Sequence, residues 1–201
     1  MAEKDYFKYK DIFVKNNSIL RMSRAIKLGI PKYVIYQMLK NGELVKEERG
    51  LYRLSKASLL SNPDLVTVSL RVPKCIICLT SALYHYELTT QIPHKVFIAL
   101  PMNFPKPRIL NPPIDVTWVS LKAFSVGIQE QVIDGVEVKM YNQEKTIVDC
   151  FKFRNKVGED VALEALQDYM KRSLPKVSLI LEYARISRVE NLMRPYLEAL
   201  V

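Results

Sequence analysis

Four polar side chains in residues 31–41 have the types and the spacing needed to contact nucleic acid bases. At 100° per residue, Tyr33, Tyr36, Gln37 and Lys40 fall on one side of a helix. Glutamine can bond adenine N6 and N7 together, lysine can reach guanine O6 or N7, and tyrosine can contact phosphate or a thymine methyl group. An amphipathic helix with a solvated outer face has the same pattern and stays open as the alternative. The opposite, apolar side of the helix is formed by Val34, Ile35, Met38 and Leu39.

Lysine and arginine residues are concentrated around this segment. Residues 1–60 contain 13 Lys or Arg and 6 Asp or Glu, a balance of +7, whereas residues 61–201 contain 17 and 15. A basic excess confined to one part of the chain favours a polyanion partner there, and we expect duplex DNA. The basic residues expected to reach DNA are Arg21, Arg24, Lys27, Lys32, Lys46, Arg49 and Arg53.

Residues that could catalyse a reaction occur in the second part of the chain, but the sets are incomplete. Ser81 and His85 have the i, i+4 spacing of a nucleophile and its base, yet no oxyanion loop or G-x-S-x-G motif accompanies them. Glu144 and Asp149 are not spaced i, i+4 and suit the start of an ordinary capped helix. We therefore expect no catalytic residues and no enzyme activity.

The cysteines indicate neither a metal site nor an oxidising compartment. Cys75 and Cys78 form a C-x-x-C in an apolar run that is typical of a buried strand, where residues i and i+3 point to opposite faces. We expect no metal and no cofactor. The chain has no apolar run of membrane-spanning length and no signal-peptide core at its start. We expect a cytoplasmic protein without a membrane partner, and a monomer in solution because no heptad pattern is present.

The elements that must position the four polar side chains form a winged helix-turn-helix over residues 1–60. Gly29 ends one helix and Pro31 opens the next, which is the turn between the paired helices. Ser18 or Ser23 is the candidate cap of the earlier helix. The expected helices cover residues 5–15, 19–28 and 31–41, and the two arms of a hairpin cover residues 44–47 and 51–54.

Residues 61–201 are expected to form a mixed α+β domain that ends in a helical C-terminal region, so the fold class is α+β. Asp134-Gly135 is a type I′ turn dipeptide between two strands. Thr80 or Ser81 is the expected cap of a short helix. The expected strands cover residues 75–79, 95–100, 115–121, 128–133 and 136–141. The expected helices cover residues 64–72, 82–88, 143–154, 159–172, 176–186 and 189–200.

These residues resemble one known family along most of the chain, from about residue 10 to the end. Residues 20–30, 39–45 (LKNGELV) and 49–54 (RGLYRL) look like the N-terminal winged helix of AbiEi-type antitoxins. The more specific match is an ordered series in the second domain, formed by SALYHYELT at 81–89, DGV at 134–136, EKTIVD at 144–149 and RNKVG at 154–158. One departure is Met22, where the family leads us to expect a Thr or Ser cap.

The resemblance implies an antitoxin of a type IV toxin-antitoxin system, associated with abortive phage infection. Such a protein represses its own operon by binding inverted repeats in the promoter through the winged helix. A dimer or two monomers that cooperate along the DNA would fit such repeats, and we expect cooperating monomers. The second domain neutralises a nucleotidyltransferase-like toxin without a stable complex. A ligand-sensing winged-helix transcriptional regulator with no antitoxin role is the alternative function.

Overall fold

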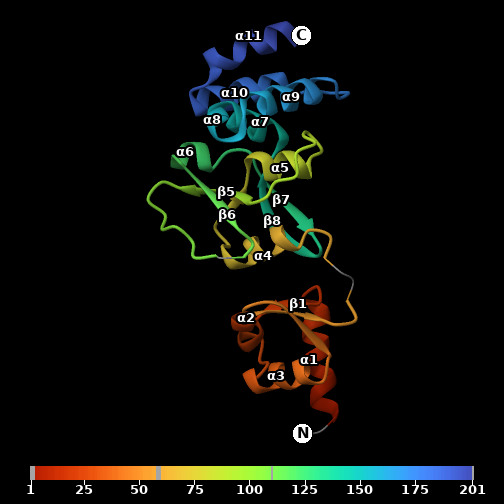
Figure 1. Cartoon of the computed structure of the whole chain (residues 1–201). Coiled ribbons are helices and arrows are strands. Elements are labelled where there is room, and N and C mark those ends of the chain that lie inside the picture. Colours follow the sequence, from red (N-terminus) through yellow and green to blue (C-terminus); the bar gives the residue numbers. More distant parts are fainter. Residues whose placement is uncertain (1–2, 58–59, 110, 201) are drawn as a thin grey trace.

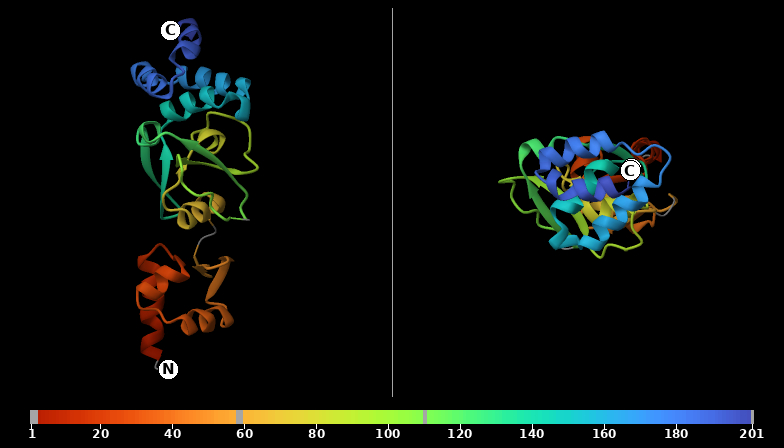
Figure 2. Two further views of the ribbon diagram at one scale, coloured as in Figure 1. Left: turned by 90° about the vertical axis from the view of Figure 1, so that its left-hand side faces the viewer. Right: turned by 90° about the horizontal axis from the view of Figure 1, so that it is seen from above.

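A computed structural model describes residues 3–57, 60–109 and 111–200. The protein is mixed α+β, with a three-stranded sheet, a five-stranded sheet and a helical C-terminal region. The N-terminal elements and the C-terminal helices lie at opposite ends of the molecule, with the larger sheet between them (Figures 1 and 2). Within these described ranges no helix is long and apolar enough to cross a membrane.

The N-terminal lobe, residues 3–57, encloses a small core of its own. Strand β3 is the middle strand of its sheet and pairs antiparallel with both β1 and β2. The elements are α1 (Glu3–Lys15), β1 (Ile19–Arg21), α2 (Met22–Lys27), α3 (Lys32–Lys40), β2 (Leu44–Glu48) and β3 (Leu51–Leu54). The core consists of Phe13, Leu20, Ala25, Ile30, Val34, Ile35, Met38, Leu44 and Tyr52.

The start of α2 differs from the prediction. The helix begins at Met22, because the three residues before it form β1 and pair with β3. Ile19 and Leu20 are buried by this pairing, so tertiary contacts override the local helical pattern. Neither Ser18 nor Ser23 is the N-cap. Arg21 occupies that position in an extended conformation and makes no side-chain cap hydrogen bond.

The C-terminal lobe, described over residues 60–109 and 111–200, is built on the five-stranded sheet with the order β6-β5-β4-β8-β7. Its strands are β4 (Ile76–Ile77), β5 (Val96–Pro101), β6 (Ile114–Val119), β7 (Ile128–Ile133) and β8 (Val136–Tyr141). The pairs β4–β8 and β5–β6 are parallel, whereas β4–β5 and β7–β8 are antiparallel. Its helices are α4 (Pro63–Arg71), α5 (Leu79–His85), α6 (Leu121–Phe124), α7 (Gln143–Lys152), α8 (Arg154–Val157), α9 (Glu159–Met170), α10 (Val177–Ser187) and α11 (Glu190–Leu200).

Helices cover both faces of this sheet, as its alternating apolar residues require. Helix α4 packs on the face that is turned toward the N-terminal lobe, and its Val66 and Val68 are fully buried there. Helices α5 and α7 pack on the other face, and α9, α10 and α11 stack beyond them (Figure 1). The second face therefore holds the larger core.

Several expected elements are confirmed and others change their limits. The β7–β8 hairpin has the predicted two-residue loop, and both Asp134 (φ +49°) and Gly135 (φ +76°) have the positive φ of a type I′ turn. The strand expected at 75–79 is only β4, because α5 already begins at Leu79. Cys78 rather than Thr80 or Ser81 precedes this helix as N-cap, without a side-chain hydrogen bond.

The β7–β8 turn also joins the two lobes. The Asp134 carboxylate accepts hydrogen bonds from the backbone N–H groups of Ser61 and Asn62, each at 2.9 Å, and from the Ser61 hydroxyl at 2.9 Å. These contacts lower the pKa of Asp134, although its partial burial acts in the opposite direction. The amide of Asn17 donates to the Gly135 carbonyl from the N-terminal lobe. The turn therefore contacts both the segment between the lobes, at Ser61 and Asn62, and the N-terminal lobe, at Asn17.

We predict that Gly135→Ala destabilises the protein more than Gly42→Ala does. Both glycines have positive φ, at +76° and +70°, so alanine costs about 1–2 kcal/mol at either position. Only at Gly135 would the added Cβ meet another atom, Asn17 Cβ at 2.5 Å, and overpacking of this kind costs about 1–3 kcal/mol more. Urea unfolding of the two variants measures the difference, and equal losses would contradict the contact between the turn and Asn17.

Candidate nucleic-acid interface

Helix α3 presents the polar side that its sequence predicts. Tyr33 and Tyr36 are 56% and 51% exposed, and Gln37 and Lys40 are exposed beside them. The apolar side is formed by Val34, Ile35 and Met38, all fully buried in the N-terminal core. The burial of one side fixes the rotation of the helix, so that four groups able to bond bases or phosphates face outward together.

One basic side chain lies beside the exposed polar side of α3. Lys32 Nζ lies 5.8 Å from the centre of the Tyr36 ring, which places a cation beside a phenol at the start of the helix. Helix α3 lies at the end of the N-terminal lobe that is remote from the C-terminal lobe (Figures 1 and 2). Four further candidate cations are exposed elsewhere in the same lobe, namely Lys27 on α2, Lys46 on β2, Arg49 in the hairpin loop and Arg24 on α2. Of these, Arg24 lines a hollow where the two lobes meet.

Arg53 is a correction to the predicted interface. Its side chain is buried, with only 6% of the residue exposed, and it forms an ion pair with Glu47. Its Nη1 atom also donates to the backbone carbonyls of Leu54 at 3.1 Å and Ala57 at 2.8 Å. Because these partners neutralise and occupy the guanidinium, Arg53 holds the end of β3 in place and does not face a DNA phosphate.

Arg21 is a second correction. It belongs to β1 instead of the predicted helix, it is half-buried, and its Nη1 atom donates to the Leu70 carbonyl of α4 at 2.8 Å. Its side chain is therefore directed toward the C-terminal lobe, away from α3. The spacing of a helix placed Arg21 with Arg24, whereas strand pairing turns the two side chains in different directions.

The Ser81 hydroxyl and the His85 ring each contact other partners in this structure. The Ser81 hydroxyl accepts a hydrogen bond from the Phe97 N–H at 2.9 Å and donates to the Lys95 carbonyl at 3.3 Å, so it ties α5 to β5. Partial burial lowers the pKa of His85. The His85 ring packs edge-to-face on Tyr86 at 5.3 Å between centroids. These contacts explain both residues as parts of the fold.

Cys75, Cys78 and Cys150 are buried free thiols. Burial raises the pKa of Cys75 to about 12, so it carries no thiolate at neutral pH. Across the part of the chain that the structure describes, no three His, Cys, Asp or Glu side chains are grouped so that they could hold a metal ion.

Lys145 is a fully buried lysine. It lies in α7 with its Nζ atom 2.5 Å from Asp149 Oδ2 and 4.5 Å from the centre of the Tyr141 ring, and its side chain has no exposed surface. The Ser187 hydroxyl donates to the other oxygen of Asp149 at 3.5 Å. Opposite charges at i, i+4 are usually a pair on a helix surface, and nothing in the local sequence indicates that Lys145 is buried.

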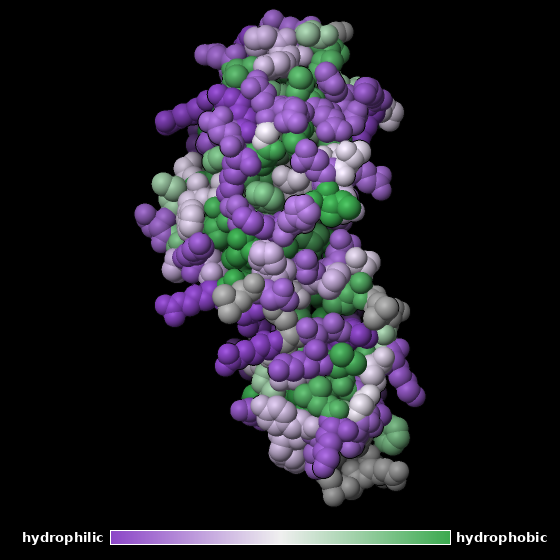
Figure 3. All heavy atoms as spheres, in the orientation of Figure 1, coloured by the Kyte–Doolittle hydropathy of each residue, from purple (hydrophilic) through white to green (hydrophobic). Residues whose placement is uncertain are grey.

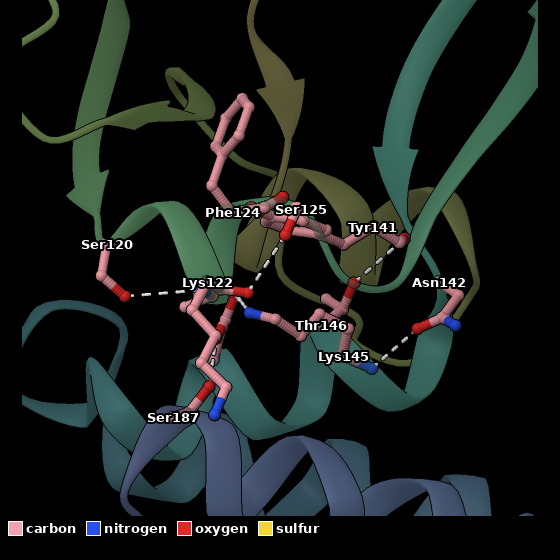
Figure 4. A network of polar contacts seen from close by, with 11 residues as sticks. Ser120, Lys122, Phe124, Ser125, Tyr141, Asn142, Lys145, Thr146 and Ser187 are labelled. Atoms are coloured by element: carbon pink, nitrogen blue, oxygen red, sulfur yellow. Dashed lines mark hydrogen bonds and ion pairs between the residues drawn. The ribbon is translucent and has the colours of Figure 1, made fainter.

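Side chains from several elements make polar contacts around Lys145 (Figure 4). Asn142 caps α7 by accepting a hydrogen bond from the Lys145 N–H at 2.9 Å. Thr146 donates to the Tyr141 carbonyl at 3.2 Å, and Tyr169 donates to Glu144 at 2.7 Å. Since all these groups satisfy one another, the cluster joins β8, α7, α9 and α10 and is structural.

The chain matches no protein-family model and no curated protein sequence. Its fold is similar to that in the crystal structure of the RV2827C protein from Mycobacterium tuberculosis, with a TM-score of 0.57. The likeness covers 92% of this chain and 76% of that chain at 14% sequence identity. It establishes a shared mixed α+β architecture.

Proposed function

We propose that the N-terminal lobe is a winged helix-turn-helix that binds duplex DNA, and that the protein is an autorepressing antitoxin of a type IV toxin-antitoxin system. The observation that carries the DNA-binding part is the exposed side of α3, where Tyr33, Tyr36, Gln37 and Lys40 lie together over a buried apolar side. In this proposal α3 is the recognition helix in the major groove, α2 crosses the backbone, and the β2–β3 hairpin is the wing.

The chemistry of each group assigns it a role in this proposal. Gln37 can form two hydrogen bonds with an adenine, and Lys40 can bond a guanine. Lys32, Arg24 and Lys27 neutralise phosphates beside the groove, and Lys46 and Arg49 do so from the wing. Inverted repeats in the promoter of the protein's own operon would be the binding site.

The antitoxin part of the proposal assigns toxin neutralisation to the C-terminal lobe. The resemblance carries this assignment, through motifs that include residues 81–89 on and after α5 and residues 144–149 on α7. No stable complex with the toxin is required. Because α3 is remote from that lobe, repression and neutralisation should be separable by substitutions in α3.

We predict that Gln37→Ala relaxes the preference for operator DNA by about 1–3 kcal/mol, because one bidentate base contact is lost. Fluorescence anisotropy with operator and random duplexes measures this preference. Gln167→Ala, an exposed glutamine on α9, is the matched control and should leave it unchanged. Lys46→Ala serves as the contrast, since losing a phosphate contact weakens binding to both duplexes equally and reduces the slope against salt.

The same Gln37→Ala protein tests the antitoxin assignment in cells that express the toxin encoded beside it. We expect derepression of the operon with full protection from the toxin. If the unaltered protein binds operator and random DNA equally, the repressor assignment is wrong. If it gives no protection from the adjoining gene product, the antitoxin assignment is wrong.

A further inference from the structure

A basic groove with a volume of about 520 Å³ lies where the two lobes meet. The residues that line it, within the described part of the chain, include five Lys or Arg and no Asp or Glu. On the left of Figure 3, at the level where the two lobes meet, hydrophilic side chains project from the molecule. The residues that matter for its chemistry are Arg21, Arg71, Lys74, Phe104, Lys106 and Arg108.

Three segments that are far apart in the sequence build this basic groove. Arg21 comes from β1 of the N-terminal lobe, Arg71 and Lys74 come from the end of α4, and the others come from the proline-rich loop between β5 and β6. The loop is held in position because the Trp118 indole N–H donates to the Phe104 carbonyl at 2.9 Å. Arg71 Nη1 donates to the Asn111 carbonyl at 3.3 Å, which ties α4 to the far end of the loop.

The positive charge of the groove favours an anionic ligand. The lining residues that the structure describes include no carboxylate, so the summed field of the five cations concentrates anions in the groove. Arginine side chains match the oxygen geometry of phosphate, and lysine adds a point charge. The volume lies within the range of about 300–1,000 Å³ that is usual for small-molecule sites.

One aromatic side chain in the groove offers a ligand a second kind of contact besides the ionic ones. Phe104 is partly buried, and Lys74 Nζ lies 5.8 Å from the centre of its ring. A phenyl ring beside a phosphate-binding group offers a stacking surface for a planar base. A free phosphate would use the cations alone, whereas a nucleotide would use both the cations and the ring.

We propose that this groove binds a nucleoside di- or triphosphate, with the phosphates on the arginine and lysine side chains and the base against Phe104. The ligand would contact both lobes, because Arg21 belongs to the first and the other residues to the second. This binding does not depend on the proposed DNA-binding or antitoxin function. A small ligand is favoured over a duplex because the cations line a hollow between lobes, whereas α3 lies at the remote end of the N-terminal lobe.

The test is isothermal titration of the full chain, without DNA, with ATP, ADP, adenosine and inorganic triphosphate. We expect ATP and ADP to bind and adenosine to bind at least 100-fold more weakly. The double variant Lys106→Ala and Arg108→Ala should weaken ATP at least tenfold. Phe104→Leu should weaken ATP severalfold and leave inorganic triphosphate unchanged, which separates stacking from charge.

Two variants outside the groove serve as matched controls. Lys122→Ala and Lys171→Ala remove exposed lysines on other elements and should leave ATP affinity unchanged. The proposal is overturned if no nucleotide binds at millimolar concentration, or if the control variants weaken ATP as much as the groove variants. It is also overturned if the groove variants lose DNA affinity while the unaltered protein binds no nucleotide, because the groove would then be a DNA contact.

Discussion

Replacing Lys145 with methionine should lower the free energy of unfolding by about 3–5 kcal/mol, because it leaves the buried Asp149 without its opposite charge. Methionine has a similar length and adds no cavity of note, so the loss reports the charge. Lys145 has no exposed side-chain surface and Asp149 has 3%, so water cannot replace the missing ammonium. Urea unfolding at neutral pH measures this effect.

The pH dependence of the Lys145→Met variant gives an independent check. Burial raises the pKa of Asp149, and the Lys145 charge opposes that rise. Without the lysine, the folded-state pKa rises further above the unfolded value of about 3.9. A group with a raised folded pKa favours the folded state at low pH and loses that contribution as the pH rises. The deficit of the variant should therefore be smaller near pH 4.5 than at pH 7.5.

Two further variants make the Lys145 result specific. Lys171→Met removes an exposed pair with Asp168, where the atoms are 2.9 Å apart but the side chains are 73% and 43% exposed, and should cost at most about 1 kcal/mol. Lys145→Met combined with Asp149→Leu removes both charges and should recover much of the loss. A Lys145→Met loss no greater than that of Lys171→Met would show that the pair is not buried.

Replacing Ile35 with alanine should destabilise the N-terminal lobe by about 2–5 kcal/mol through a lost side chain and the cavity left behind. Ile35 is fully buried in the core of a lobe of about 55 residues, and so small a core has little stability to lose. We expect this lobe to exchange its amide hydrogens rapidly while α7 and α9 keep their protection. DNA binding should fall with it, because α3 needs its buried side to be held in place.

The matched control for Ile35→Ala is Ile26→Ala on α2. Ile26 is 48% exposed, so the same chemical change should cost less than about 1 kcal/mol. Hydrogen exchange measured by mass spectrometry resolves the two lobes within one protein. Equal exchange in the two variants, or equal loss of protection in both lobes of Ile35→Ala, would show that the N-terminal core does not carry the local stability that we assign to it.

Features that depend on neighbours in the sequence were predictable. The 3.6-residue period of α3 specified which side is buried, since Val34, Ile35 and Met38 fall on the core side without reference to the rest of the chain. The Asp134-Gly135 dipeptide specified the β7–β8 hairpin because few other residues accept its backbone angles. The helical C-terminal region followed from the same periodicity. The division at residues 60 and 61 and the winged helix-turn-helix stay proposals.

Features that depend on distant partners were decided by the tertiary structure alone. Strand β1 is three residues long and exists because β3, about thirty positions later, pairs with it; this pairing turned Arg21 toward Leu70. Arg53 is buried where its guanidinium pairs with Glu47 and donates to the Ala57 carbonyl. The pair of Lys145 and Asp149 is buried because α9 and α10 pack against α7. The basic groove needs three separate segments of the chain. A local pattern determines which side of an element is apolar, whereas the burial of a charge depends on what packs against it.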